Sequence, residues 1–179
     1  MICEIFDDLL EPHVAELIDM EIKKTHWKYD YHSNQRIGIQ PHWHVFCGES
    51  EEEVRERQYD YLLPIWDAAA YKLKLKERFD IVGWKRLYMN AHTFGIEPHM
   101  HFDDGDFTMI YYPKFANGSK WKWEWGGGTQ VGDVVVDNVG NRALIFNAKS
   151  PHRALPVSDE CTLLRSVIVF KMLEKNNGI

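Results

Sequence analysis

The sequence predicts a mainly β domain, in which helices pack on one outer face of a β-sandwich or barrel. Helical periodicity is confined to about the first 80 residues. From about Val82 onward, glycines become frequent, apolar runs shorten and β-branched residues increase. Helices followed by a run of short strands are typical of two layers around one core. With 179 residues, the chain is long enough for one domain and short for two.

Two helices are expected in the N-terminal part, residues 1–80. Apolar residues recur with helical spacing from Glu11 to Lys24. A second helix is expected to start near Ser50, because Ser50 and Glu53 have the spacing of a capping box, and to run to about Leu75 with a bend at Pro64. Between them, residues 26–46 are rich in histidine and aromatic residues and carry few structural signals, which favours a lid or a substrate loop.

The remaining part, residues 81–173, is expected to form the β core of this single domain. Five segments combine β-branched and aromatic residues with turn residues at their ends, as strands do. They cover residues 83–92, 106–115, 129–139, 141–148 and 162–172.

Composition argues against several function classes. The net charge of −6 gives no support to nucleic-acid binding, which requires clustered Lys and Arg. Three widely spaced cysteines are typical of reduced thiols. The start MICEIFDDLLEPH lacks the basic and then apolar pattern of a signal peptide, and no apolar run approaches 18 residues. We therefore expect a cytoplasmic chain without a membrane partner.

The stretch PHMHFDDGD, residues 98–106, contains a candidate metal site. His101 and Asp103 are two residues apart, so on an extended chain both side chains point to the same face. His152, 49 residues beyond Asp103, is the best third ligand. Two histidines and one carboxylate leave three positions of an octahedral metal open, which is the arrangement of non-haem Fe(II) oxygenases. Taken alone, however, a His-x-Asp pair arises often by chance, and a DDGD run is usually a solvated turn. His99 is also on the same face as His101, and we assign it to the rim.

Arg165 is the second part of the constellation. In LLRSVIVFK it leads an apolar strand, on the same face as Val167 and Val169. Burying an arginine is costly without an anionic partner, and its planar fork suits a carboxylate. An arginine at a strand end is ordinarily a surface residue, but its place 13 residues after a candidate metal histidine favours an anion-binding role.

Together, His101-x-Asp103, His152 and Arg165 resemble the motif of the Fe(II)- and 2-oxoglutarate-dependent oxygenases. The surrounding sequence segments resemble those of the prolyl 4-hydroxylase-like branch: Glu97-Pro98-His99, MIYYPKF, WEWGGGTQV and GNRALIFNAKSPHRALPV. NAHTFG is also similar to a stretch in small oxygenases of bacterial viruses, in which case the cytoplasm would be that of a host. The resemblance covers about Lys85 to Met172. It departs from the pattern at Gly128, where the family has an acid, and in the two residues between Pro98 and His101.

The resemblance implies a double-stranded β-helix, or jelly roll, with iron held by His101, Asp103 and His152. The co-substrate 2-oxoglutarate would chelate the iron, and its 5-carboxylate would pair with Arg165 and accept a hydrogen bond from Tyr112. Tyr111 and Tyr112 point to opposite strand faces, so only one of them can do this, and the resemblance selects Tyr112 by its place in the family's Ile-Tyr-Tyr motif. Either Asn90 or His92 would also contact 2-oxoglutarate. O₂ is the second co-substrate, and ascorbate is expected as a reductant.

The substrate is the least specified part. Every second residue from position 121 to 125 is a tryptophan: Trp121, Trp123 and Trp125. They form either an ordinary stripe on one face of the sandwich or a platform for the substrate. His99 would also contribute to substrate binding. The resemblance implies hydroxylation of a peptidyl proline. Two alternatives stay open: the same machinery acting on a free amino acid or small metabolite, and a cupin-like metal-binding module without turnover. Arg165 and Tyr112 argue against the cupin, which needs no anion clamp behind its metal.

Overall fold

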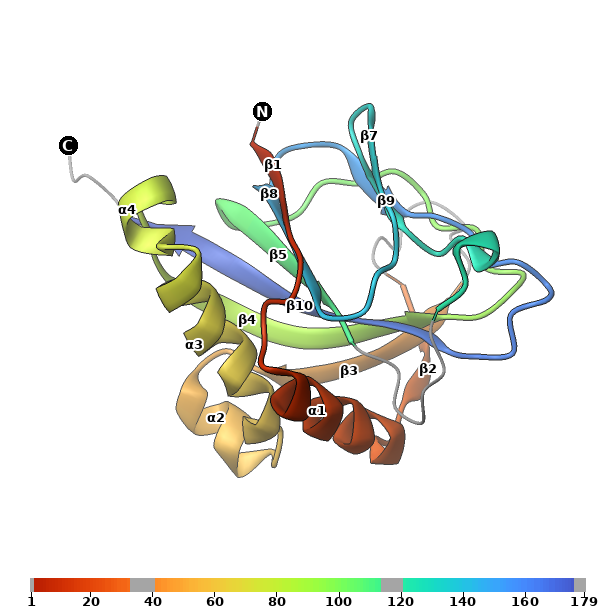
Figure 1. Ribbon diagram of the computed structural model, residues 1–179, viewed down its shortest axis with the longest axis horizontal. Coiled ribbons are helices and arrows are strands. Elements are labelled where there is room, and N and C mark those ends of the chain that lie inside the picture. The colour runs from red at the N-terminus through yellow and green to blue at the C-terminus, as the bar shows by residue number, and fades with distance from the viewer. Residues whose placement is uncertain (1, 33–40, 114–120, 176–179) are drawn as a thin grey trace.

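In the computed structural model, which describes residues 2–32, 41–113 and 121–175, two antiparallel sheets face each other (Figure 1). The large sheet has the strand order β1-β8-β5-β10-β4-β3-β2, and the small sheet has the order β7-β6-β9. The strands are β1 Cys3–Phe6, β2 Lys28–Tyr31, β3 His42–Gly48, β4 Ile81–His92, β5 Phe107–Tyr112, β6 Thr129–Val131, β7 Val134–Val136, β8 Arg142–Asn147, β9 His152–Ala154 and β10 Arg165–Glu174.

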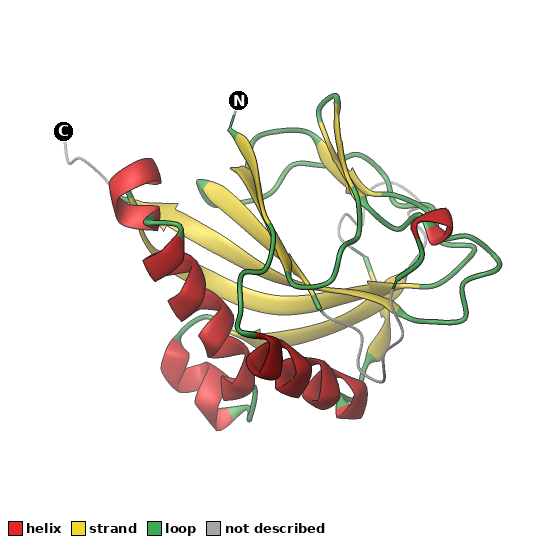
Figure 2. Ribbon diagram, in the orientation of Figure 1, coloured by secondary structure: helices red, strands yellow, loops and turns green. Residues whose placement is uncertain are grey.

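The helices cover the face of the large sheet that lies away from the small sheet (Figure 2). They are α1 Pro12–Lys24, α2 Glu51–Glu56, α3 Leu63–Lys72 and α4 Leu75–Phe79, with short 3₁₀ turns at Asp60–Leu62 and Trp123–Trp125. The prediction of helices on one outer face is confirmed. The prediction of one bent helix from Ser50 to Leu75 is wrong, because Gln58 and Lys74 adopt left-handed φ values of 64° and 51° and interrupt it.

One of the two hydrogen bonds of the predicted capping box at Ser50 is present. Its hydroxyl accepts a hydrogen bond from the backbone N–H of Glu53 at 3.2 Å, as the capping box predicts. The Glu53 carboxylate, however, accepts from the backbone N–H of Glu49 at 2.8 Å. The helix start is therefore where the sequence places it, with a different partner for the glutamate.

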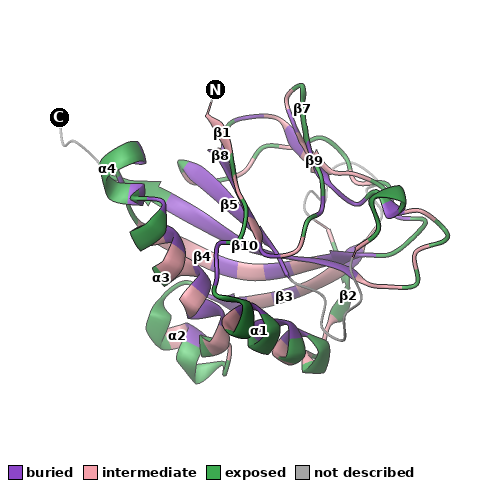
Figure 3. Ribbon diagram, in the orientation of Figure 1, coloured by how far each residue is buried: buried purple, intermediate pink, exposed green. Residues whose placement is uncertain are grey.

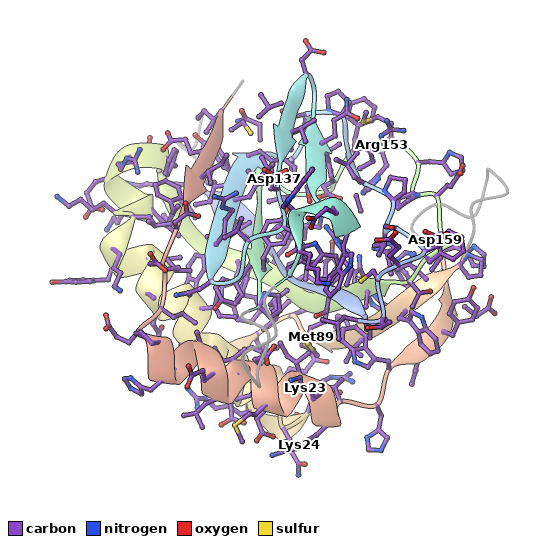
Figure 4. The ribbon with its side chains drawn as sticks, turned by 45° about the vertical axis from the view of Figure 1, so that its right-hand side comes forward. Lys23, Lys24, Met89, Asp137, Arg153 and Asp159 are labelled. Atoms are coloured by element: carbon purple, nitrogen blue, oxygen red, sulfur yellow. The ribbon has the colours of Figure 1, made fainter. Side chains whose placement is uncertain are left out.

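Alternation along the central strands divides the core into two parts. Ile168, Phe170 and Met172 of β10 belong to the cluster beneath the helices, while Val167 and Val169 belong to the cluster between the sheets. Figure 3 shows β5 and β10 buried along most of their length. In Figure 4, Met89 of β4 lies on the α1 side, whereas Lys24 of α1 points away from the sheet. Alternate residues of one strand therefore pack either against the helices or between the two sheets.

The small sheet is built on a tight hairpin. Val131 pairs with Val134 across the two-residue turn Gly132–Asp133, and Gly132 has a φ of 56°, which glycine adopts at no steric cost. On its other side β6 pairs with β9, and an isolated bridge joins His101 to His152 at the start of β9. This sheet therefore brings the PHMHFDD stretch against the segment that carries His152.

The five predicted strand segments all contain strands, although residues 114 and 115 lie outside the described part. The structure adds β1, β2, β3 and β9. The stretch expected as a lid or substrate loop, residues 26–46, contains β2 and most of β3, and its residues 33–40 lie outside the described part. The tryptophan stripe is not a strand, because its central residues form a 3₁₀ turn. No helix in the described ranges is long and apolar enough to cross a membrane.

Candidate metal and co-substrate site

A cavity of about 1080 Å³ opens between the two sheets. Its floor is formed by alternate residues of neighbouring strands of the large sheet: His42 and His44 of β3, Tyr88, Asn90 and His92 of β4, and Arg165, Val167, Val169 and Lys171 of β10. His99, His101, Asp103 and His152 also border it. Seven of the ten predicted site residues thus border one cavity, whereas Tyr112, Trp123 and Trp125 are not part of its lining.

The three predicted metal ligands converge although 49 residues separate Asp103 from His152. His101 and His152 exchange two backbone hydrogen bonds of 2.9 Å, and the backbone N–H of Asp103 donates to Ala148 at 2.9 Å. One ligand atom from each of the three side chains lies within 4.8 Å of the other two. The backbone pairing thus gathers a donor set of two imidazoles and one carboxylate.

Both imidazoles are oriented by backbone carbonyls. Nδ1 of His101 lies 3.0 Å from the carbonyl oxygen of His99, and Nδ1 of His152 lies 2.9 Å from that of Ser150. A carbonyl only accepts, so each Nδ1 carries the proton and each Nε2 presents its lone pair. Burial and the neighbouring His152 lower the pKa of His101, which keeps this ring neutral at pH 7. His99 contributes its backbone rather than its ring, in accord with its assignment to the rim.

The Asp103 carboxylate is ionised. Burial raises the pKa of its carboxyl, but the charge of the adjacent Lys171 ammonium outweighs burial and holds the pKa well below its usual range. Its Oδ2 atom lies 3.1 Å from Nε2 of His152 and accepts a hydrogen bond from the Thr108 hydroxyl at 2.7 Å. Neutral imidazoles and an ionised carboxylate are the protonation states in which these groups bind a divalent metal, so the residues fit an iron ion.

Arg165 lies on the same cavity floor and is 1% exposed. Its Nε donates to the carbonyl of Gly127 at 2.7 Å, and its Nη2 donates to the carbonyl of Gly128 at 3.2 Å and to the Thr129 hydroxyl at 3.3 Å. Burial lowers the pKa of its guanidinium, and no carboxylate in the described ranges forms an ion pair with it. A buried cation held only by neutral groups is a binding position for an anion.

The triple glycine explains how Arg165 is held. A Cβ atom on Gly128 would lie 2.4 Å from the carbonyl oxygen of Val136, and one on Gly127 would lie 3.1 Å from Cγ of Arg165. Only glycine therefore lets this segment approach both β7 and the arginine. Gly128 stands where the resembled family has an acid, and in this chain the position contributes its carbonyl oxygen to Arg165.

Tyr112 and His92, two of the predicted co-substrate residues, lie beside Arg165. Tyr112 lies on the arginine's side of β5, with its ring 5.8 Å from the guanidinium carbon, and its hydroxyl donates to Thr129 at 2.6 Å. Tyr111 lies in the helix-side core and donates to Asn141, which confirms that the two tyrosines face opposite ways. Nδ1 of His92 lies 3.4 Å from Nη1 of Arg165. Burial and the charge of Arg165 lower the pKa of His92 to about 2, so His92 is neutral.

Asn90 belongs to a row of polar groups beside the metal ligands. Its side-chain oxygen lies 2.7 Å from Nδ1 of His44, and the His44 ring stacks on Tyr31 with 3.8 Å between ring centroids. His42 lies next in this row, and burial, followed by the charge of His44, lowers its pKa to about 4. Asn90 and His92 both border the cavity, and a contact of either with the co-substrate stays a prediction.

Trp123 and Trp125 lie away from this row. Trp125 packs against Trp121 with 5.4 Å between ring centroids, and Trp123 is 83% exposed. Their role in substrate binding stays a prediction, and any such role would lie outside the cavity.

Sequence reasoning missed Thr108, His42, His44 and Lys171 as cavity residues. Strand alternation could have predicted two of them. Lys171 is an even number of residues from Arg165 in β10, and Thr108 is an even number from Tyr112 in β5, so each pair points to the same face of the sheet. His42 and His44 belong to the histidine-rich stretch expected as a lid or substrate loop, and their place on the cavity floor was missed because strand β3 was not predicted.

No family model and no curated protein matches the chain. Among solved structures, a Pseudomonas putida prolyl-4-hydroxylase matches with a TM-score of 0.61 and 14% identity, over 97% of this chain and 92% of that one. A Trichoplax adhaerens prolyl hydroxylase, solved with a peptide fragment of the hypoxia-inducible factor, has a TM-score of 0.59 and 15% identity over 94% and 82%. A non-haem α-ketoglutarate-dependent epimerase from nogalamycin biosynthesis has a TM-score of 0.65 and 12% identity over 96% and 78%.

These matches span nearly the whole chain, so they cover the helices as well as the two sheets. They confirm the predicted jelly roll with flanking N-terminal helices. The chain therefore has the fold of the Fe(II)- and 2-oxoglutarate-dependent oxygenases, in the form that the prolyl 4-hydroxylases adopt.

Proposed function

We propose that the chain is an Fe(II)- and 2-oxoglutarate-dependent dioxygenase that hydroxylates a C–H bond of a peptidyl proline. Iron would be held by His101, Asp103 and His152, and the 5-carboxylate of 2-oxoglutarate by Arg165. One observation carries the proposal: the three convergent metal donors and a buried arginine without a carboxylate partner in the described ranges border the same cavity. A plain metal-binding module needs the donors but not the arginine.

The bound iron, with 2-oxoglutarate and O₂, would supply the oxidising chemistry, and ascorbate would serve as the reductant that keeps the iron ferrous. The chain's own residues bind and orient. The carbonyls of His99 and Ser150 fix the ligand tautomers, and Thr108 fixes the Asp103 carboxylate. Arg165 would neutralise the distal carboxylate, with Tyr112 and Thr129 completing its surroundings. The apolar side chains of Val167 and Val169 on the floor would limit water beside the reacting centre.

The peptidyl substrate rests on two supports. The words Glu97-Pro98-His99 and MIYYPKF resemble those of prolyl hydroxylases, and two of the similarly folded proteins are named as such, one of them with a bound peptide fragment. The cavity is also bordered by β2, an edge strand whose four residues are all exposed. An extended peptide can pair with such an edge.

A free amino acid or small metabolite is the second candidate, and the likeness to an epimerase of nogalamycin biosynthesis favours it. The test is a screen of proline-containing peptides, free proline and other free amino acids, with Fe(II), 2-oxoglutarate and ascorbate present. The readout is a mass increase of one oxygen atom, and Asp103→Ala is the control. The peptidyl proposal predicts oxidation of a proline peptide. Faster oxidation of free proline than of any peptide would transfer the assignment to the second candidate.

A further inference from the structure

Lys171 is a second buried cation on the cavity floor. Lys171 lies six residues after Arg165 in β10, so both side chains point to the cavity side of the sheet. The Lys171 side chain is 3% exposed. A lysine is almost never buried this fully unless it is paired. Its partner is Asp103: the ammonium forms an ion pair with the Oδ2 atom of this predicted metal ligand. The two cations of the strand therefore differ, since Arg165 has no carboxylate partner in the described ranges and Lys171 contacts the metal carboxylate itself.

Strand register sets this contact. Lys171 of β10 lies directly opposite Thr108 of β5, and its Nζ lies 3.5 Å from the Thr108 hydroxyl oxygen. The Thr108 hydroxyl donates in turn to Oδ2 of Asp103 at 2.7 Å. Asp103 also lies five residues before Thr108, so the three groups close a ring across two paired strands. Two adjacent strands, rather than a mobile side chain alone, keep the ammonium at this oxygen.

The two oxygens of Asp103 have different surroundings. Oδ2 accepts from Thr108 and Lys171 and lies 3.1 Å from Nε2 of His152. Oδ1 faces Nε2 of His101 at 3.8 Å. An ionised carboxylate has about two lone-pair sites on each oxygen, so two donors occupy those of Oδ2. Oδ1 is the oxygen that remains for a metal.

This asymmetry matters for a metal that must take up two co-substrates. Two histidines and an aspartate bound through one oxygen leave three positions of an octahedron. A chelating 2-oxo acid takes two of them, and O₂ needs the third. An aspartate bound through both oxygens would occupy that third position.

We propose that Lys171 is a positioning residue that, together with Thr108, reserves Oδ2 of Asp103, so that this carboxylate binds the metal through Oδ1 alone and one metal position stays open. The inference rests on the proposed function. Lys171 touches neither co-substrate nor substrate in this account and acts through Asp103.

The test measures the open position rather than turnover. Nitric oxide binds where O₂ would, and its ferrous adduct has an electron paramagnetic resonance signal. Wild type and Lys171→Met are loaded anaerobically with Fe(II) and 2-oxoglutarate and titrated with nitric oxide. Lys171→Met should retain Fe(II), and its nitric oxide affinity should fall by about 10- to 100-fold, the usual cost of removing a group that orients a metal ligand. Lys171→Arg keeps the cation and should stay near wild type.

Lys149→Met is the matched control. The Lys149 ammonium also contacts Asp103, but it donates to the backbone carbonyl at 3.0 Å and is exposed. Its loss should leave nitric oxide binding unchanged. If Lys171→Met does not fold, Thr108→Val and Thr108→Ser carry the test, since only the valine removes the donor to Oδ2.

The outcomes separate the two proposals. A folded Lys171→Met protein that binds nitric oxide like wild type, or that loses Fe(II) altogether, overturns the role of Lys171, and so does a Thr108→Val protein equal to Thr108→Ser where that pair carries the test. Iron-loaded wild type that does not bind 2-oxoglutarate overturns the proposed function instead.

Discussion

His99 and His101 stand two residues apart, yet they contribute to the site through different atoms. His101 offers Nε2 to the cavity, whereas His99 offers the carbonyl oxygen that holds Nδ1 of His101. The sequence alone favoured His101 by the carboxylate two residues later. The structure adds a physical reason, because any residue at position 99 supplies that carbonyl.

The first prediction follows from this difference. His101→Ala, Asp103→Ala and His152→Ala should each abolish detectable Fe(II) binding, because two remaining donors do not hold the ion in competition with water. His99→Ala should bind iron with nearly unchanged affinity. Anaerobic Fe(II) titration of the four variants checks this. Metal lost from His99→Ala and kept by His101→Ala would show that the ligands are assigned wrongly.

At the residue scale, spacing selected the triad of His101, Asp103 and His152, together with Arg165, as candidates, and the resemblance to a family supplied the roles predicted for them. Lys171 was missed, although alternation from Arg165 through Val167 and Val169 leads directly to it. Near the end of an apolar strand, a lysine is ordinarily solvated. Its pairing with Asp103 depends on the register between β10 and β5, which the sequence does not state.

Strands were predictable where they were long and apolar. β4, β5, β8 and β10 have that character and were found, as was the segment with the short β6 and β7. The missed strands are β1, β2 and β9, of three or four residues each, and β3, which is longer but rich in histidine. Short strands are held by their neighbours: β9 pairs with β6, and its first residue bridges to His101. The Ser50 helix was overextended because its interruption at Gln58 and Lys74 uses non-glycine residues in left-handed conformations, which carry no clear sequence signal.

The second prediction tests the glycine segment before β6. Gly128→Ala should destabilise the fold by about 1–3 kcal/mol, because its Cβ would lie 2.4 Å from the backbone oxygen of Val136. Gly83→Ala in β4 is the matched control, since a Cβ there meets no atom within 4 Å. The measurement is urea unfolding followed by circular dichroism. Equal midpoints for the two variants would mean that the segment yields without cost.

The third prediction concerns β3, where burial lowers the pKa of His42 from 6.5 to about 4. Above pH 6.5, His42 is neutral in both the folded and the unfolded chain. Between pH 6.5 and 4 the unfolded chain takes up a proton that the folded chain does not, so stability falls as pH falls. At about 1.4 kcal/mol per pKa unit, His42 should account for about 3 kcal/mol of this loss.

His42→Gln provides the comparison, because glutamine keeps a polar side chain that does not titrate. The free energy of unfolding is measured for both proteins from pH 7 to pH 4. The variant should lose less stability than wild type over this range. Parallel curves would show that His42 titrates normally in the folded protein.

At the scale of the whole molecule, the order of helices before strands predicted both layers and the side on which the helices lie. That prediction succeeded because the apolar stripe of a helix and the apolar face of a sheet must be buried, and each can bury the other. The arrangement leaves the other face of the large sheet free to form the cavity floor. Floor residues come from strands far apart in sequence, so the cavity became visible only once the strand order was known.

Substrate identity is less accessible from the sequence than the metal and co-substrate residues. Iron and 2-oxoglutarate require fixed donor types, whereas a substrate is recognised by a surface that varies with its shape. The exposed strand β2 and the row formed by Tyr31, His44 and Asn90 border the cavity in this chain. β2, Tyr31 and His44 lie in the part of the sequence with the fewest structural signals, and Asn90 lies opposite His44 on the neighbouring strand.

The central claim is that Arg165 and the triad act together, and the affinity for 2-oxoglutarate, measured anaerobically on iron-loaded protein, tests it most directly. Arg165→Ala should weaken binding by about 2–5 kcal/mol, the cost of removing one partner of a buried charge pair. This corresponds to about 30-fold to several thousand-fold, at about 1.4 kcal/mol per tenfold. Arg165→Lys should lie between wild type and alanine, because it keeps the charge but not the fork.

Tyr112→Phe should weaken binding less than Arg165→Ala, since it removes a single hydroxyl that in this structure donates to Thr129. Iron affinity should stay nearly unchanged in all three variants, because none of these side chains contacts the triad. We expect metal-dependent 2-oxoglutarate binding that collapses in Arg165→Ala. A folded Arg165→Ala protein that binds 2-oxoglutarate within a few-fold of wild type would contradict it and favour a cupin-like metal-binding module.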